Sequence, residues 1–375
     1  MDEVFFCKEK FREHYAKSRI ISVPSCPSRE FGVGFVDKID FRHKSFSTND
    51  LLADFLARDA PFYVSYSTAR YELPEAKPMP KKGFLGADLV FDLDRQYGEE
   101  HAEKHNAIFC LHCLERARQD AQRFLEEILL GDFGFSKSGV SYNYSGSKGF
   151  HLHVRSDSVQ QLSSDARKEL CDYAAGFEVN AKTILSKSVL EGKRTQHSLR
   201  GPSSSSHGWG KKAFLFAKSF CENATEKDFV EAGTKPKAAK QFVENRAAAL
   251  QKMSQGNWDY IAGMEECFDA LVEKCVAEQR IELDKPVSFD RSRLIRIPNS
   301  LHGDTGLLAK TLSSLENFSP DKAAVAFHGA ATIVSASSFS FDFNDANYSF
   351  VEKESKQVPL AVAVLLLRKQ KAFLP

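Results

Sequence analysis

The stretch Gly86-Ala-Asp-Leu-Val-Phe-Asp-Leu-Asp94 decides how the rest of the sequence is interpreted. Read with a period of two residues, one face carries Leu89, Phe91 and Leu93. The opposite face carries Asp88, Val90, Asp92 and Asp94. The apolar face and the β-branched and aromatic content predict a strand with one side packed into a core.

Asp92 and Asp94 stand at the end of this strand and share its polar face. Two neighbouring carboxylates repel one another unless a positive charge lies between them. Hard oxygen ligands suit Mg²⁺ or Mn²⁺, and two such ions can clamp a phosphoryl group during in-line displacement. The pattern therefore indicates a divalent-metal site, and the alternative is a strand end whose acids face solvent.

The composition is typical of a globular protein: of 375 residues, 42% are hydrophobic and 27% are charged. Lys and Arg number 51 and Asp and Glu 50, so the net charge is +1. A polyanion would have to meet a local basic patch, because the chain has no overall positive field. No signal peptide or long apolar span is apparent, which predicts a cytoplasmic, nucleoid-associated protein without a membrane partner.

The order of predicted elements indicates an α/β core built from the two ends of the chain. We expect residues 1–160 and 286–375 to form this core, and residues 161–285 to form a helical insertion. The Ser/Gly-rich basic stretch 193–212 is expected to be a mobile loop inside the insertion. The predicted strands are 29–35, 62–67, 140–144, 150–154 and 293–297, and the predicted helices are 1–20, 49–56, 113–130, 164–176, 237–253 and 257–280.

The loop Ser145-Gly-Ser-Lys-Gly-Phe-His151 has the chemistry of a phosphate-binding turn. Its glycines let backbone amides approach an anion, and Ser145, Lys148 and His151 add a hydroxyl, an ammonium and an imidazole. His151, His153 and Arg155 then share one face of the following strand, where they repel unless an anion or acid lies opposite. The alternative is a solvated hairpin face.

The segment from Asp290 to His302 gathers Arg291, Arg293, Arg296 and His302 beside one carboxylate. Arginine is the side chain suited to bidentate phosphate contact. Asp290 is either a third metal ligand or the ion-pair partner of a neighbouring arginine. We favour the ligand, because a further carboxylate would help the Asp92–Asp94 pair to hold two ions.

A candidate zinc site lies between the acidic strand and the next helix. His101, His105, Cys110 and Cys113 supply four nitrogen or sulfur ligands within 101–113, enough for tetrahedral Zn²⁺. His112 competes as the fourth ligand, and the alternative is that these residues are near one another by chance. The sequence predicts a structural zinc knuckle.

Taken in order, three motifs resemble the signatures of one enzyme family. They are Gly86-Ala-Asp-Leu-Val-Phe-Asp-Leu-Asp94, Ser145-Gly-Ser-Lys-Gly-Phe-His151 and Arg293-Leu-Ile-Arg-Ile-Pro-Asn-Ser-Leu-His-Gly303. The chain resembles the small catalytic subunit of archaeal-eukaryotic DNA primase. The resemblance implies a mixed β-sheet with flanking helices, a helical subdomain and a zinc knuckle.

The resemblance also implies a division of roles among the predicted site residues. It assigns two Mg²⁺ or Mn²⁺ ions to Asp92, Asp94 and Asp290. It assigns the nucleotide phosphates to Ser145, Lys148, His151, Arg296 and His302. The implied activity is template-directed de novo synthesis of short primers from nucleoside triphosphates on single-stranded DNA, for DNA replication. The implied partner is a large subunit with an iron–sulfur cluster.

Two other classes of protein remain open from the residues themselves. A metal-dependent phosphodiesterase would use the same acids, but it has no need of a triphosphate pocket. A non-catalytic, zinc-stabilised nucleic-acid-binding subunit would not need three carboxylates, and it would be expected to carry more positive charge than +1.

Overall fold

The computed structural model describes residues 2–36, 38–94, 108–190 and 196–375. The chain forms two compact units. The first comprises Met1–Glu126, Phe135–Cys171 and Leu283–Pro375, and the second comprises Glu127–Gly134 and Asp172–Glu282. The first unit is thus assembled from both ends of the chain, and the mixed α/β fold class predicted from sequence is confirmed.

The main strands of the first unit form two four-stranded sheets. One has the strand order β11-β3-β1-β2, and the other has the order β12-β7-β8-β6. The first sheet contains β1 (Phe31–Gly34), β2 (Phe41–Lys44), β3 (Tyr63–Ser67) and β11 (Leu294–Arg296). The second contains β6 (Leu89–Asp94), β7 (Val140–Tyr144), β8 (Gly149–Val154) and β12 (Thr311–Leu312).

The acidic stretch forms β6, as its alternation predicts. β6 pairs antiparallel with β8, so that Asp92 lies opposite His151 and Leu93 lies opposite Phe150. Both strands contact α4 (Leu111–Arg123), and the ring of Phe91 meets Phe124 at a centroid distance of 4.6 Å. The apolar face of β6 therefore lies in the core, and its acids are left on the other side.

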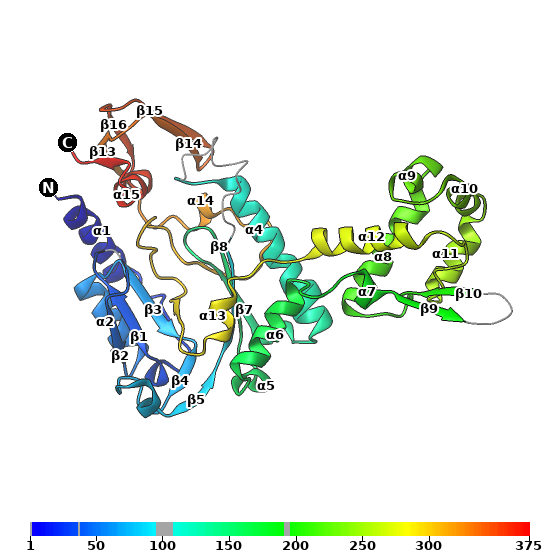
Figure 1. Ribbon diagram of the computed structural model, residues 1–375. Helices are drawn as coiled ribbons and strands as arrows, with labels where there is room; N and C mark the ends of the chain where they lie inside the picture. The colour runs from blue at the N-terminus through cyan, green and yellow to red at the C-terminus, as the bar shows by residue number, and fades with distance from the viewer. Residues whose placement is uncertain (1, 37, 95–107, 191–195) are drawn as a thin grey trace. The chain divides into compact units, whose positions relative to one another are not determined.

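The remaining elements of the first unit surround these sheets. Helices α1 (Glu3–Lys17) and α15 (Leu360–Arg368), from the two ends of the chain, contact one another (Figure 1). The other helices are α2 (Asn49–Asp59), α5 (Asp157–Gln160), α6 (Ser164–Ala174), α13 (Lys285–Phe289) and α14 (Pro320–Ala323). Smaller sheets use β4 (Ala69–Tyr71), β5 (Phe84–Ala87), β13 (Ala330–Ser335), β14 (Phe339–Phe343), β15 (Ala346–Phe350), β16 (Ser355–Pro359) and β17 (Ala372–Phe373).

The second unit is mostly helical and has a core of its own. Its helices are α7 (Ala181–Ile184), α8 (Gly208–Asn223), α9 (Glu226–Glu231), α10 (Pro236–Glu244), α11 (Arg246–Ser254) and α12 (Glu265–Gln279). A π-helical segment, Phe124–Asp132, continues α4 into this unit. The core includes Phe214, Phe229, Phe242, Trp258 and Phe268. Among the described residues of both units, none of the helices combines the length and the apolar character needed to cross a membrane.

Two boundaries differ from those expected. The longer segment of the second unit begins at Asp172 rather than at 161, because α6 starts on the first unit, where Arg167 donates to the carbonyls of Ala87 and Asp88. The expected loop 193–212 contains β10 (Gln196–Arg200), paired with β9 (Ser186–Leu190), and the start of α8. The Ser- and Gly-rich composition of this stretch gave no sign of the strand, whose partner lies earlier in the chain. It also gave no sign of α8, whose buried face includes Trp209.

Candidate active site

A cavity of about 370 Å³ in the first unit brings together residues from all three motifs. Eight residues were predicted to bind the nucleotide and the Mg²⁺ or Mn²⁺ ions. Seven of them line this cavity: Asp92, Asp94, Ser145, Lys148, His151, Arg296 and His302. It also includes Ser65, Ser147, Asp284, Val287, Arg293, Leu294, Ile295 and Asp304. Acids and bases therefore face one open cavity, as a site for a metal-bound phosphate requires.

Asp92 and Asp94 occupy the cavity end of β6. Burial, together with the charges of Asp94 and Asp284, holds the pKa of Asp92 well above its usual value. Burial also raises the pKa of Asp94, although Lys148 opposes that shift. The Oδ1 atom of Asp92 is buried and accepts no hydrogen bond from the described part of the chain. An ionised carboxylate in this position is costly unless a cation joins it.

The third acid at the cavity is Asp284, not Asp290. The backbone N–H of Asp284 donates to the carbonyl of Asp92 at 3.0 Å, which anchors it beside β6. The carboxylate of Asp290 instead accepts from the backbone N–H and the hydroxyl of Ser292, at 2.9 and 2.7 Å, and it does not line the cavity. Asp290 therefore stabilises a local turn, and its predicted place beside the acid pair is corrected to Asp284.

Sequence reasoning missed Asp284 because it follows no pattern of its own. It precedes Lys285-Pro286, and this combination of residues is typical of a helix start. The helix α13 does start there, but the side chain of Asp284 makes no capping hydrogen bond. In the sequence, therefore, nothing distinguishes Asp284 from an ordinary capping acid.

The loop between β7 and β8 is held in shape by Ser145 and two glycines. The hydroxyl of Ser145 accepts from the backbone N–H groups of Ser147 and Gly149, at 3.3 and 3.1 Å. A Cβ at Gly149 would lie 2.0 Å from the carbonyl oxygen of Leu93. Gly146 has φ +88°, and a Cβ there would lie 2.7 Å from the Cβ of His302. Glycine is therefore required at both positions, because the loop backbone packs closely against β6 and His302.

Arg296 and His302 bring basic groups to the same cavity. The Nη1 atom of Arg296 is buried without a hydrogen-bond partner among the described residues, so its charge is available to a ligand. His302 Nδ1 accepts from the backbone N–H of Asp304 at 3.1 Å. Burial holds the pKa of His302 well below its usual value, with Arg296 adding to the shift. His302 is therefore a neutral imidazole whose Nε2 carries the proton.

The donor set fits a divalent metal ion that binds together with a phosphate. The unpartnered Oδ1 of Asp92 and the nearby Asp94 offer hard oxygen ligands. Within the described residues, no three His, Cys, Asp or Glu side chains converge closely enough to hold an ion alone. Mg²⁺ is commonly bound by one or two carboxylates, with phosphate oxygens and waters completing its coordination.

The predicted zinc knuckle is described only in part. His101 and His105 lie outside the described residues. Cys110 and Cys113 are both buried, and the Cys110 sulfur accepts from the backbone N–H of Cys113 at 3.4 Å, at the start of α4. The two cysteines are thus side by side, and the zinc set stays a prediction.

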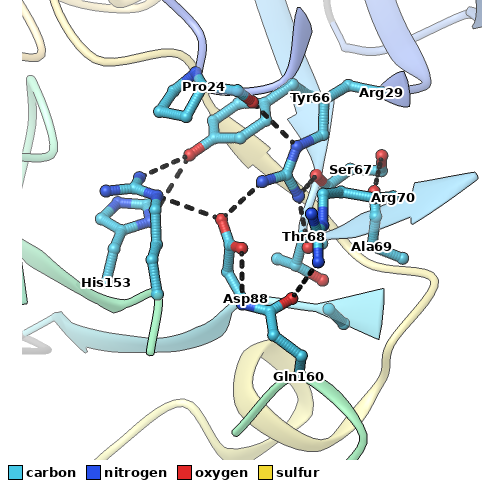
Figure 2. Close-up of polar contacts among 12 residues, drawn as sticks. Pro24, Arg29, Tyr66, Ser67, Thr68, Ala69, Arg70, Asp88, His153 and Gln160 are labelled. Carbon is cyan, nitrogen blue, oxygen red and sulfur yellow. Dashed lines mark hydrogen bonds and ion pairs between the residues drawn. The ribbon is translucent and has the colours of Figure 1, made fainter. Parts of the chain in front are cut away.

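A buried network around Asp88 joins the acidic strand to the first sheet (Figure 2). The Asp88 carboxylate accepts from Arg29 at 2.7 Å and from Arg155 at 3.1 Å, and Gln160 lies 3.5 Å away. Arg29 also donates to the carbonyls of Pro24, Ser67 and Thr68. This cluster explains why Asp88, on the same face as Asp92, is a structural acid rather than a ligand.

Paired acids facing arginine, lysine and imidazole groups across one cavity define a class of proteins that act on phosphoryl groups. Comparison with known protein families narrows this class to one family. Residues 91–314 match the profile of the DNA primase small subunit. The chain belongs to the DNA primase small-subunit family.

Curated relatives support this membership along most of the chain. The DNA primase small subunit of Methanothrix thermoacetophila is 34% identical, with 86% of each chain covered. That of Methanococcoides burtonii is 31% identical over the same shares. That of Methanosarcina acetivorans is 29% identical, with 96% of this chain and 94% of its own length covered.

Proposed function

We propose that this chain is the catalytic subunit of a DNA primase and that it is a nucleotidyltransferase. It would join nucleoside triphosphates into short primers, de novo and under the direction of a single-stranded DNA template. The observation that carries the proposal is that one cavity holds two buried charged atoms that make no hydrogen bond with the described residues, the Oδ1 atom of Asp92 and the Nη1 atom of Arg296. A metal-bound triphosphate complements both charges.

The basic residues of the cavity would bind and orient the triphosphate. Lys148 and Arg296 supply positive charge, and His302 supplies a neutral N–H donor. Ser145 holds the shape of the loop that carries Lys148 at the cavity. These donors would stabilise the charge that develops on the leaving pyrophosphate.

The acidic residues would hold the metal ions. Asp92 and Asp94 are the ligands we propose, with Asp284 as the third carboxylate in place of Asp290. Bound Mg²⁺ or Mn²⁺ lowers the pKa of an attacking hydroxyl and neutralises phosphate charge. No protein nucleophile is needed, because the attacking group is the 3′-hydroxyl of a nucleotide.

Primer synthesis on an unprimed single-stranded template, measured with labelled nucleoside triphosphates, tests the proposal. We expect product only when template and divalent metal are both present. A metal-dependent phosphodiesterase would degrade the template and incorporate nothing. A non-catalytic binding subunit would bind the template and leave both it and the nucleotides unchanged.

The role of His302 gives a prediction about nucleotide binding. His302→Ala should raise the nucleotide KM and lower kcat, together by about tenfold to a hundredfold in kcat/KM, because a buried donor to a charged ligand is lost. His328→Ala is the matched control, since His328 is exposed and does not line the cavity. A lower melting temperature with unchanged KM and kcat would show instead that His302 only supports the turn to Asp304.

We propose that the two cysteines belong to a structural Zn²⁺ site completed by His101 and His105. Such a site stabilises the folded chain rather than the chemistry. Cys110→Ser should therefore lower the melting temperature by more than it lowers kcat per folded molecule, and Cys221→Ser, at a buried cysteine of the second unit, is the control. Metal analysis of the purified wild type should find one zinc per chain, and a zinc-free, fully stable protein would contradict the site.

We further propose that the chain works as a heterodimer with a large subunit that carries an iron–sulfur cluster. The relatives are named as small subunits, which supports the existence of a larger partner. Co-purification of the two subunits after joint expression, with the absorption of the cluster in the complex, is the test.

A further inference from the structure

A line of buried polar side chains runs from Arg155 to the cavity along β3, β7 and β8. Arg155 Nη2 lies 3.2 Å from the hydroxyl of Tyr66, and that hydroxyl lies 3.5 Å from His153 Nδ1. Figure 2 shows Tyr66 reaching toward His153 above Asp88. His153 Nε2 lies 3.1 Å from Asn143 Oδ1, and Asn143 Nδ2 lies 3.4 Å from His151 Nδ1. His151 Nε2 then lies 3.7 Å from Asp92 Oδ1, at the cavity.

The direction of the hydrogen bonds in this line follows from the amide of Asn143. Its Nδ2 donates to the backbone carbonyl of Tyr144, so its Oδ1 faces His153 Nε2, which must carry a proton and donate to it. Burial lowers the pKa of His153 and keeps the ring neutral, so its Nδ1 accepts the proton of Tyr66, and the same hydroxyl accepts from Arg155. The guanidinium group of Arg155 is itself held in place, because its Nε donates to the Asp88 carboxylate at 3.1 Å.

The amide of Asn143 cannot be reversed without cost. Its Nδ2 also donates to the backbone carbonyl of Tyr144 at 2.9 Å, and a flipped amide would place two oxygens against one another. Nδ2 must therefore be the group that faces His151 Nδ1. The side chains of Asn143, Tyr66 and His153 are almost fully buried, so water does not compete with these bonds.

From this geometry we infer that Asn143 is a positioning residue that donates to Nδ1 of His151 and so keeps the ring proton on Nε2, which faces Asp92 and the phosphate of an incoming nucleotide. The phosphate part of this inference rests on the proposed function. The relay from Arg155 through Tyr66 and His153 would keep Asn143 in the required orientation.

The tautomer can be measured directly on the full-length protein without nucleotide. Histidines labelled with ¹⁵N give different ring nitrogen shifts for protonated and unprotonated Nδ1 and Nε2, and His151→Ala identifies the signals of this residue. We expect wild-type His151 to show a protonated Nε2 and an unprotonated Nδ1. A proton on Nδ1 in the wild type would overturn the inference.

Substitution of Asn143 supplies the functional test. Asn143→Leu has a similar volume and no donor, and Asn143→Ala serves if the leucine variant does not fold. Either variant should mix the two His151 tautomers and raise the nucleotide KM by about tenfold, the usual cost of one lost buried hydrogen bond. Asn347→Leu, at an exposed asparagine of β15, is the matched control and should change neither quantity.

A double-mutant cycle separates positioning from a general structural effect. If Asn143 acts through His151, the nucleotide KM of the double variant Asn143→Leu/His151→Ala should equal that of His151→Ala alone. Additive changes in KM would overturn the inference. If His151→Ala leaves the nucleotide KM unchanged, the proposed phosphate contact of His151 is wrong, while the ¹⁵N measurement still decides whether Asn143 sets the tautomer.

Discussion

Primer synthesis by the Asp92→Asn variant is expected to fall by at least about a thousandfold, because a metal ion that binds the reacting phosphate contributes several kcal/mol to catalysis. Asparagine keeps the size of the side chain and removes the charge from the buried, unpartnered Oδ1 position. Asp284→Asn should show a loss of the same kind, since Asp284 lines the same cavity. Initial rates of nucleotide incorporation at a range of Mg²⁺ concentrations provide the measurement.

Asp290→Asn is the matched control for these two variants. Its carboxylate accepts hydrogen bonds from Ser292 and does not line the cavity, so its loss should cost little synthesis. Near wild-type turnover by Asp92→Asn would contradict the metal assignment. Loss of synthesis by Asp290→Asn with full activity of Asp284→Asn would restore the ligand expected from the sequence.

The acid pair also predicts how stability depends on pH in metal-free buffer. The pKa values of Asp92 and Asp94 are higher in the folded chain than in the unfolded chain. Their contribution to the free energy of unfolding is therefore greatest below the ordinary aspartate pKa and decreases as the pH rises through the raised values. Asp92→Asn removes part of this cost, so above the raised pKa it should melt at a higher temperature than the metal-free wild type.

Arg29→Met should destabilise the first unit by about 3 kcal/mol, at the lower end of the cost of breaking a buried ion pair, because Asp88 keeps its second partner, Arg155. The ion pair of Arg29 with Asp88 is almost fully buried, and Arg29 also donates to three backbone carbonyls. Met has a similar length and no charge, so volume changes little. Denaturant unfolding measures the change in free energy.

Arg19→Met is the matched control for the buried pair. Arg19 pairs with Asp54, but both side chains are 56% exposed. Exposed ion pairs contribute about 0–1 kcal/mol, so this variant should unfold at nearly the wild-type denaturant concentration. Equal effects of the two substitutions would show that the Asp88 network does not stabilise the unit.

Local patterns were sufficient to predict the strands and loops that form the cavity. The alternation in 86–94 predicted β6, and the glycines of 145–149 predicted a tight loop between β7 and β8. These features depend on the alternation of apolar and polar side chains and on the backbone conformation of a turn. Both are determined by residues that follow one another in the sequence. The resemblance to the primase small subunit, rather than the local pattern, implied that His151 belongs to the same site as Asp92, and their cross-strand register agrees with this.

Features set by contacts between distant parts of the chain could not be predicted in this way. Asp284 reaches the cavity through a backbone hydrogen bond to Asp92, 192 positions earlier in the sequence. Asp88 looked like a third acid of the strand, but Arg29 and Arg155 neutralise it. The stretch 196–212 looked irregular, because the pairing of β10 with β9 and the burial of α8 depend on tertiary contacts.

The formation of the first phosphodiester bond tests the central claim most directly. The wild-type protein, an unprimed single-stranded DNA template, nucleoside triphosphates and Mg²⁺ or Mn²⁺ are mixed, and dinucleotide and pyrophosphate are measured together, with ribo- and deoxyribonucleotides in separate reactions. The proposed function predicts one pyrophosphate per bond, a dinucleotide that keeps its 5′-triphosphate, and no product without template or metal. Cleavage of the template without release of pyrophosphate, or neither product with template bound, would contradict it.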